Sequence, residues 1–173
     1  MDANLMLRWR RSRQSNGQGV VVMGRYLLAL LLASSAFFAS TEARAETCPG
    51  NLIGVKPLLW GDGARLGELQ LYYNPANGRN CARVVHGGET WGQRRRTDVM
   101  IETCTRAMFR ANGNTCPPVA SIPRRTWQGV TRYSTNTVSL PGRGRCVDAT
   151  GGIERRLNVN VGTASRLAGF CGN

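Results

Sequence analysis

His86 is the one histidine of the chain, and imidazole is the side chain best suited to proton transfer near neutral pH. It follows an apolar run and precedes Gly87 and Gly88, so we expect it at the end of a strand. With Glu102 and an arginine, His86 would provide the groups with which small secreted ribonucleases cleave a phosphodiester. A histidine before two glycines is more often a solvated turn residue, and we favour that interpretation. We therefore assign no catalytic residue, and keep His86 with Glu102 as the alternative.

Motifs of other common enzyme classes do not occur in the sequence. It has no Gly-x-Ser-x-Gly elbow, no His-Glu-x-x-His pair and no glycine-rich phosphate loop that ends in Lys-Ser or Lys-Thr. Zinc sites use closely spaced ligands, whereas the two nearest cysteines are Cys104 and Cys116. We expect no metal and no cofactor, and we rank an enzyme below a binding protein.

Two sets of residues are candidates for binding without catalysis. Arg94, Arg95 and Arg96 form the densest charge cluster after the N-terminal segment, and they are either an anion-binding group or a solvated turn. Six aromatic residues would form a stacking face for sugar rings or, with arginines, for single-stranded nucleic acid, or would pack in the core: Trp60, Trp91, Trp127, Tyr72, Tyr73 and Tyr133. Their spacing shows no pattern, so we favour packing for the aromatic residues and solvent for the arginines.

The chain is strongly basic, with a net charge of +13. The part after Ala45 keeps a net charge of +9, and all of its cations except Lys56 are arginines. A field of this size attracts polyanions without a shaped site, and salt weakens the attraction. A GC-rich genome would produce the same bias towards arginine. If the charge is functional, we expect anionic wall polymers or surface proteins as partners rather than nucleic acid.

All six cysteines lie after residue 45: Cys48, Cys81, Cys104, Cys116, Cys146 and Cys171. An even number of cysteines confined to one part of the chain is typical of a domain that forms disulfides in an oxidising compartment. The sequence does not choose among the many pairings. The local arrangement suggests Cys104 with Cys116 across a short polar segment, and Cys146 with Cys171. Cys48 is then left with Cys81.

The pattern of apolar residues predicts strands. Leu69, Leu71 and Tyr73 alternate with polar residues in 67–73, and Asn77-Gly78 predicts the turn of a hairpin whose second strand is 81–85. Further strands are expected at 97–103, 129–140, 145–148 and 157–161, and Gly87-Gly88, Asn112-Gly113 and Gly151-Gly152 are expected in turns. Residues 51–60 are ambiguous, and no window shows a helical stripe. We predict an all-β fold, a small disulfide-stapled sandwich or barrel.

The N-terminal residues have the three-part layout of a secretory signal. Arginines precede an apolar run from Tyr26 to Ser40, and Ala43 and Ala45 provide the small residues that signal peptidase recognises. The run is shorter than the roughly 20 residues of a membrane-crossing helix, so we expect no membrane span in the mature protein. We predict a cleaved signal peptide at residues 1–45, with Met23 as a candidate start, and a single secreted β domain at residues 46–173.

Several segments occur in an order that carries a family resemblance: 67–74, 77–82, 144–148, 151–153 and 170–172. In this order they resemble the spore-associated protein A family of secreted actinobacterial proteins. The resemblance covers most of the chain from Leu66, with a gap around 104–123. It implies an extracellular or spore-surface protein with no established enzymatic activity. Cys48, Cys81, Cys146 and Cys171 match the framework of the family, whereas Cys104 and Cys116 are additional.

Three hypotheses follow for the function. The first is a non-catalytic secreted protein at the cell wall or spore surface that binds anionic polymers. The second is a small secreted enzyme, such as a basic ribonuclease that uses His86. The third is a secreted inhibitor that displays the loop between Cys104 and Cys116.

Overall fold

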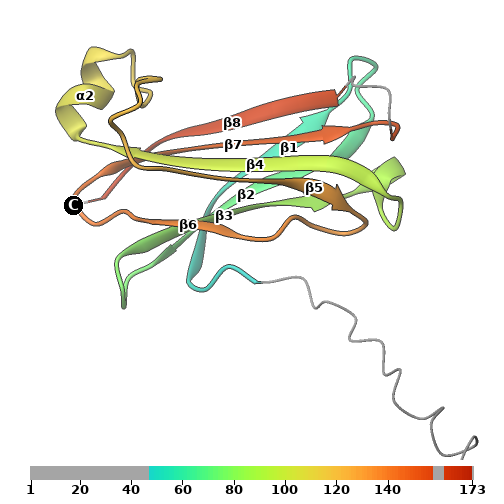
Figure 1. Cartoon of the computed structure of the whole chain (residues 1–173), viewed down its shortest axis with the longest axis horizontal. Coiled ribbons are helices and arrows are strands. Elements are labelled where there is room, and N and C mark those ends of the chain that lie inside the picture. The colour runs from blue at the N-terminus through green and yellow to red at the C-terminus, as the bar shows by residue number, and fades with distance from the viewer. Residues whose placement is uncertain (1–46, 158–161, 173) are drawn as a thin grey trace, which may run out of the picture. The chain divides into compact units, whose positions relative to one another are not determined.

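A computed structural model describes residues 47–157 and 162–172. Their elements are β1 (Asn51–Leu59), β2 (Arg65–Asn74), β3 (Arg79–His86), η1 (Gly88–Thr90), β4 (Arg95–Cys104), α2 (Arg106–Ala111), β5 (Arg124–Thr131), β6 (Val138–Pro141), β7 (Cys146–Glu154) and β8 (Gly162–Cys171). The strands form two antiparallel sheets, ordered β1-β2-β3-β6 and β5-β4-β7-β8, which face each other (Figure 1). The predicted all-β fold with disulfides is confirmed, and it is a sandwich.

The predicted hairpin is formed by β2 and β3. These strands pair in continuous register from Gly67 opposite His86 to Asn74 opposite Arg79. Gly78 in the connecting turn has a φ of +66°, a value that glycine adopts without steric cost. The alternation in β2 places every second residue on the inner face of its sheet, as the sequence pattern predicts.

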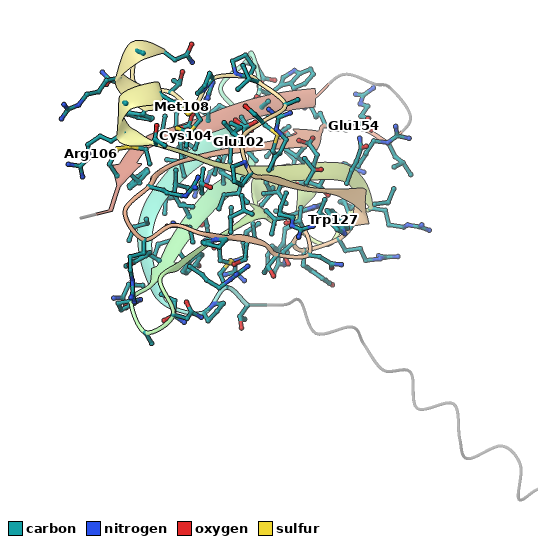
Figure 2. All side chains as sticks on the ribbon, turned by 60° about the vertical axis from the view of Figure 1, so that its left-hand side comes forward. Glu102, Cys104, Arg106, Met108, Trp127 and Glu154 are labelled. Atoms are coloured by element: carbon teal, nitrogen blue, oxygen red, sulfur yellow. A yellow bond between two sulfur atoms is a disulfide. The ribbon has the colours of Figure 1, made fainter. Side chains whose placement is uncertain are left out.

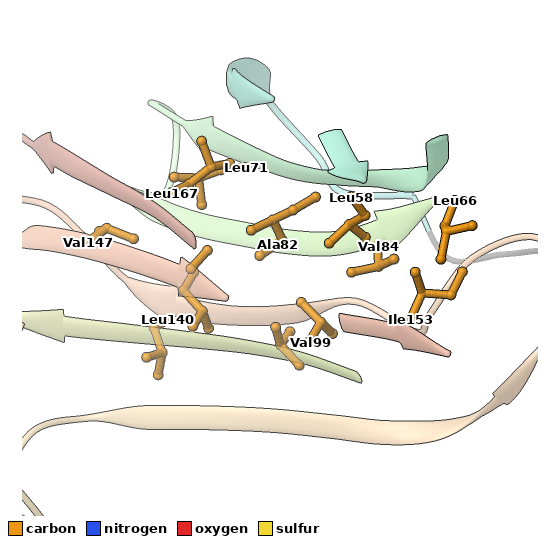
Figure 3. Close-up of a cluster of buried hydrophobic side chains, with 14 residues drawn as sticks. Leu58, Leu66, Leu71, Ala82, Val84, Val99, Leu140, Val147, Ile153 and Leu167 are labelled. Atoms are coloured by element: carbon orange, nitrogen blue, oxygen red, sulfur yellow. The ribbon is translucent and has the colours of Figure 1, made fainter. Parts of the chain in front are cut away.

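The core consists of apolar side chains from the inner faces of both sheets (Figure 3). The first sheet contributes Leu66, Leu69, Leu71, Ala82 and Val84, and the second contributes Val99, Ile101, Val147, Ala149 and Ile153. Each of these side chains is almost completely removed from water. Burial of a Val, Leu or Ile side chain contributes about 1.5–3 kcal/mol, so this layer supplies the main force that holds the sheets together.

The predicted turn at Gly151-Gly152 is wrong, because β7 continues through both glycines. A Cβ atom on Gly151 would lie 2.4 Å from a methyl group of Val84, and one on Gly152 would lie 2.5 Å from the carboxylate of Asp98. The glycines are therefore needed for close approach rather than for a change of direction. The predicted strand at 145–148 is only the first part of β7.

The predicted single strand at 129–140 is also wrong. β5 ends at Thr131 and β6 begins at Val138, and the two strands belong to different sheets. The chain between them crosses from one sheet to the other, and the Thr135 hydroxyl accepts a hydrogen bond from the Val84 amide (3.0 Å). Of the strand predicted at 157–161, Leu157 lies in a turn and the other residues lie outside the described part. The ambiguous segment 51–60 is largely β1.

Three disulfides join Cys48 to Cys81, Cys104 to Cys116 and Cys146 to Cys171, as predicted. The second of them holds the segment that contains α2, a helix that the sequence pattern does not predict. The Thr105 hydroxyl caps this helix by accepting a hydrogen bond from the Met108 amide (3.2 Å). Phe109 is buried beside the Cys104–Cys116 disulfide. The segment is thus a folded unit with its own small apolar cluster.

Substitution of Gly151 tests the close approach of the sheets. We expect Gly151→Ala to lower the free energy of unfolding by about 2 kcal/mol, because the new methyl group overlaps Val84 and Leu69. Urea denaturation with the disulfides intact measures this loss. Gly61→Ala is the matched control, since no described atom lies within 4 Å of its Cβ position. Equal stability of the two variants would contradict the packing argument.

Candidate anion-binding surface

His86 is a buried residue, and only 3% of its surface is exposed. Its Nδ1 atom lies 3.0 Å from the Thr90 carbonyl oxygen, and its Nε2 atom lies 2.9 Å from the Thr131 hydroxyl. Burial lowers the pKa of His86 below its ordinary value of 6.5; the Thr90 hydrogen bond opposes this effect and the charge of Arg95 adds to it. Its interpretation as a solvated turn residue is therefore wrong. The ring joins β3, η1 and β5.

Glu102 lies on the outer face of the second sheet and is also buried (Figure 2). Its carboxylate forms an ion pair with Arg124 of β5. Directly opposite on β7, Asp148 forms an ion pair with Arg166 and accepts a hydrogen bond from the Cys116 amide (2.7 Å). These carboxylates are thus held by neighbouring cations, and they fasten β5, β8 and the Cys116 segment to the centre of the sheet.

The structure does not bring His86 and Glu102 together. His86 contacts Thr131 at one end of β5, and Glu102 contacts Arg124 at the other end. Seven residue steps along an antiparallel strand correspond to roughly 23 Å. A shared catalytic site for these two residues is therefore ruled out by the geometry.

Arg94, Arg95 and Arg96 do not form one cluster: Arg94 precedes β4, and Arg95 and Arg96 are successive residues of β4 whose side chains point to opposite faces. Arg96 forms an ion pair with Glu154 of β7, with an N to O distance of 3.7 Å. Arg95 donates a hydrogen bond to the Arg94 carbonyl oxygen (2.9 Å). Arg94 is exposed and has no carboxylate partner among the described residues. As an anion-binding group, the predicted trio is thus reduced to Arg94 and Arg95.

A second exposed arginine and two exposed aromatic rings accompany Arg94 at this end of the sandwich. The rings of Trp91 and Tyr133 pack edge to face with their centres 5.1 Å apart, although 57% and 50% of these residues is exposed. Arg132, the neighbour of Tyr133, donates to the Gly92 carbonyl oxygen (3.3 Å) and accepts from the Gly92 amide through its own carbonyl (3.0 Å). We call Trp91, Arg94, Arg132 and Tyr133 the arginine–aromatic rim.

The other aromatic residues have structural contacts. Trp60 and Trp127 are partly buried against the main core, and the Arg155 guanidinium lies 5.7 Å from the centre of the Trp60 ring. The Tyr72 hydroxyl donates to Gln70 (2.7 Å) and accepts from Arg83 (3.2 Å). Packing is thus the right interpretation for these three aromatic residues and the wrong one for Trp91 and Tyr133. The exposure of the latter pair has no signal in the sequence, since neither residue lies in an alternating pattern.

The distribution of ion pairs leaves a large positive charge without partners. The described residues include seventeen Lys and Arg side chains and seven carboxylates. Five arginines pair with six of the carboxylates, and Arg155 alone binds both Asp62 and Glu89. Twelve cations of the described part therefore have no carboxylate partner, and Arg94 and Arg132 are among them. Asp98 is the one described carboxylate outside these pairs.

No metal site or membrane helix is evident in the described part of the chain. Residues 47–157 and 162–172 contain no group of three or more His, Cys, Asp or Glu side chains that could hold a metal ion. No helix within these ranges is long and apolar enough to cross a membrane. The side chains of the arginine–aromatic rim offer charge, hydrogen bonds and ring contacts to a ligand.

The fold and this surface define a disulfide-stabilised, all-β protein with an excess of unpaired cations. Comparison of the chain with protein-family models, with curated proteins and with solved structures found no match.

The buried state of His86 predicts how stability depends on pH. Because its pKa is lower in the folded protein than in the unfolded chain, the stability that neutral His86 provides is complete above about pH 6.5 and is lost as the pH falls through the folded pKa. Urea denaturation at a series of pH values should show that the advantage of the native protein over His86→Gln shrinks in acid. Parallel curves for the two proteins would contradict this assignment.

Proposed function

We propose that the protein is a non-catalytic secreted protein that is retained at a cell wall or spore surface through binding to anionic polymers. The observation that carries this proposal is the set of twelve described cations without carboxylate partners. A protein surface with such an excess attracts polyanions over a distance of about 10 Å at 0.1 M salt. The binding it provides is broad in specificity and sensitive to salt.

Export is part of the same proposal. The predicted signal peptide at residues 1–45 and the resemblance to the spore-associated protein A family both favour a location outside the cell. The three disulfides support it, because such bonds form and persist in oxidising environments.

The arginine–aromatic rim is the part of this surface best suited to a repeating polymer. Arg94 and Arg132 provide guanidinium groups for phosphate or carboxylate oxygens, and Trp91 and Tyr133, close to them in the chain, provide exposed aromatic surface. A stacked ring contributes about 1–3 kcal/mol in single-stranded nucleic acid complexes, and sugar rings use the same kind of face. The rim therefore adds to the affinity for an anionic polymer that the net positive charge of the surface provides.

The alternatives receive less support. A ribonuclease mechanism needs His86 in contact with substrate, whereas both ring nitrogens of His86 are occupied by threonine oxygens inside the fold. An inhibitor that displays the segment from Cys104 to Cys116 has no support beyond the exposure of that segment: residues 105–107 and 110–114 are exposed, and the segment contains α2 and buries Phe109.

Retention on surfaces tests the general proposal. The purified mature protein, added to washed cells or spores, should stay bound in low-salt buffer and should be released as sodium chloride rises towards 1 M, where screening shortens the range of the field to about 3 Å. The bound fraction is measured by immunoblot after sedimentation. Complete loss of the protein in the low-salt wash would refute surface retention.

Charge-matched variants test the rim. We expect Arg94→Gln with Arg132→Gln to weaken binding to purified teichoic acid, and to lower the slope of log affinity against log salt by about 1.4, since each phosphate contact to a single chain contributes about 0.7. The control is Arg110→Gln with Arg125→Gln, two exposed arginines without ion pairs among the described residues. If both double variants weaken binding equally, only the general charge acts and the rim has no special role.

A further inference from the structure

A pocket of about 380 Å³ opens at the other end of the sandwich from the arginine–aromatic rim. It lies where β3 begins and β8 ends, beside the connection between β6 and β7. This volume is within the range of pockets that hold small molecules. The proposed polymer binding makes no use of this pocket.

One side of the pocket is apolar. It is formed by Ile53 of β1, Tyr73 of β2 and Phe170 of β8. Phe170 lies against Gly54, where an added Cβ atom would be 2.6 Å from the ring. The glycine thus leaves room for the aromatic ring, and the three side chains present a surface for a hydrocarbon chain or ring.

The opposite side of the pocket is polar. Asn80 lines it and is only 3% exposed, yet its side-chain amide has no hydrogen-bond partner among the described residues. The amide rests on the backbone of Gly142, where a Cβ atom would lie 1.5 Å from the Asn80 Nδ2 atom. Asn80 is not among the described residues that have a fully buried, unpaired polar atom, so its amide is accessible to solvent, and a ligand oxygen in the pocket would accept from it in place of water.

One cation approaches this polar side. Gly172, which lines the pocket next to Gly142, accepts a hydrogen bond through its carbonyl oxygen from Arg106 of α2 (3.1 Å; Figure 2). Arg106 has no carboxylate partner among the described residues. Arg79 and Arg143 are chain neighbours of Asn80 and Gly142 but have contacts elsewhere, since Arg79 donates to Ser139 and Arg143 donates to the Pro75 carbonyl oxygen. The polar side is therefore suited to a negatively charged group.

From this arrangement we propose that the pocket binds a small amphipathic carboxylate, with its hydrocarbon part against Ile53, Tyr73 and Phe170 and its carboxylate beside Asn80 and Arg106. Charge complementarity selects an anion over a neutral amphiphile. The apolar wall selects a molecule with a hydrocarbon part over a free small anion. Both selections follow from the two unlike sides of one pocket.

Three probes separate these contributions: octanoate, which has both parts, 1-octanol, which has only the apolar part, and acetate, which has only the charge. Each is titrated into the mature protein and followed by two-dimensional amide NMR. Octanoate should give saturable shifts at Ile53, Asn80 and Phe170. We expect 1-octanol to bind about tenfold more weakly, because it lacks the charge that strengthens hydrogen bonds from Asn80 and Arg106. Acetate should give no saturable shift at these residues.

Variants assign the carboxylate position. Arg106→Gln changes an exposed residue of α2 and should weaken octanoate binding about tenfold without changing the affinity for 1-octanol. Asn80→Ala should act in the same direction. Arg94→Gln, at the rim, removes the same charge and should leave octanoate binding unchanged. Because Arg94 takes part in the proposed polymer binding, Arg94→Gln also shows whether a change in polymer binding by itself affects octanoate binding.

Three outcomes would overturn the proposal. One is octanoate shifts that do not saturate or that lie away from the pocket. Another is equal affinity for octanoate and 1-octanol in the unmodified protein. The third is an equal loss of octanoate binding in Arg106→Gln and Arg94→Gln, which would assign the effect to net charge alone.

Discussion

The arrangement of the whole domain depends on how closely β7 approaches the opposite sheet. Gly151 allows Val84 and Leu69 to occupy the space where its own side chain would lie. A side chain in a strand points to one face or the other, so a shift of one residue in β7 would exchange every inward and outward residue. The apolar residues Val147, Ala149 and Ile153 would then face water, and Asp148 and Glu154 would face the core. The core, the outer ion pairs and the two ends of the sandwich all follow from this register.

Much of this fold could be predicted from local patterns. The hairpin of β2 and β3 has clear alternation and a suitable turn, and the three disulfides connect cysteines that are successive along the chain. The turn predicted at Gly151-Gly152 is wrong because a glycine pair occurs in the sequence both at turns and where two sheets approach closely. The short helix α2 was missed because one cap and one buried phenylalanine give no periodic stripe. The role of Asn80 depends on contacts with residues more than sixty positions away, which local patterns do not contain.

The electrostatics of the domain follow from a shortage of acids. Six of the seven described carboxylates form ion pairs: the buried Glu102 and Asp148 fasten edge elements to the second sheet, and at the surface Arg155 joins Asp62 to Glu89 across two connections. Each such pair consumes a negative charge that would otherwise offset the arginines outside. The same ion pairs that order the sheets therefore leave both ends of the sandwich positive. Which arginines remain unpaired depends on the register between β4 and β7, because the register decides which carboxylate lies opposite each arginine on the same face of the sheet.

The disulfides have a further consequence for the integrity of the chain. Their three loops, 48–81, 104–116 and 146–171, follow one another without overlap. No bond links one loop to the next, and none connects the β1-β2-β3-β6 sheet to the β5-β4-β7-β8 sheet. A protease cut in the stretch before Cys104 or in the one after Cys116 would thus produce fragments held only by non-covalent contacts. The disulfides therefore make each loop durable, whereas the two sheets are held to each other by the buried side chains, by hydrogen bonds and by ion pairs.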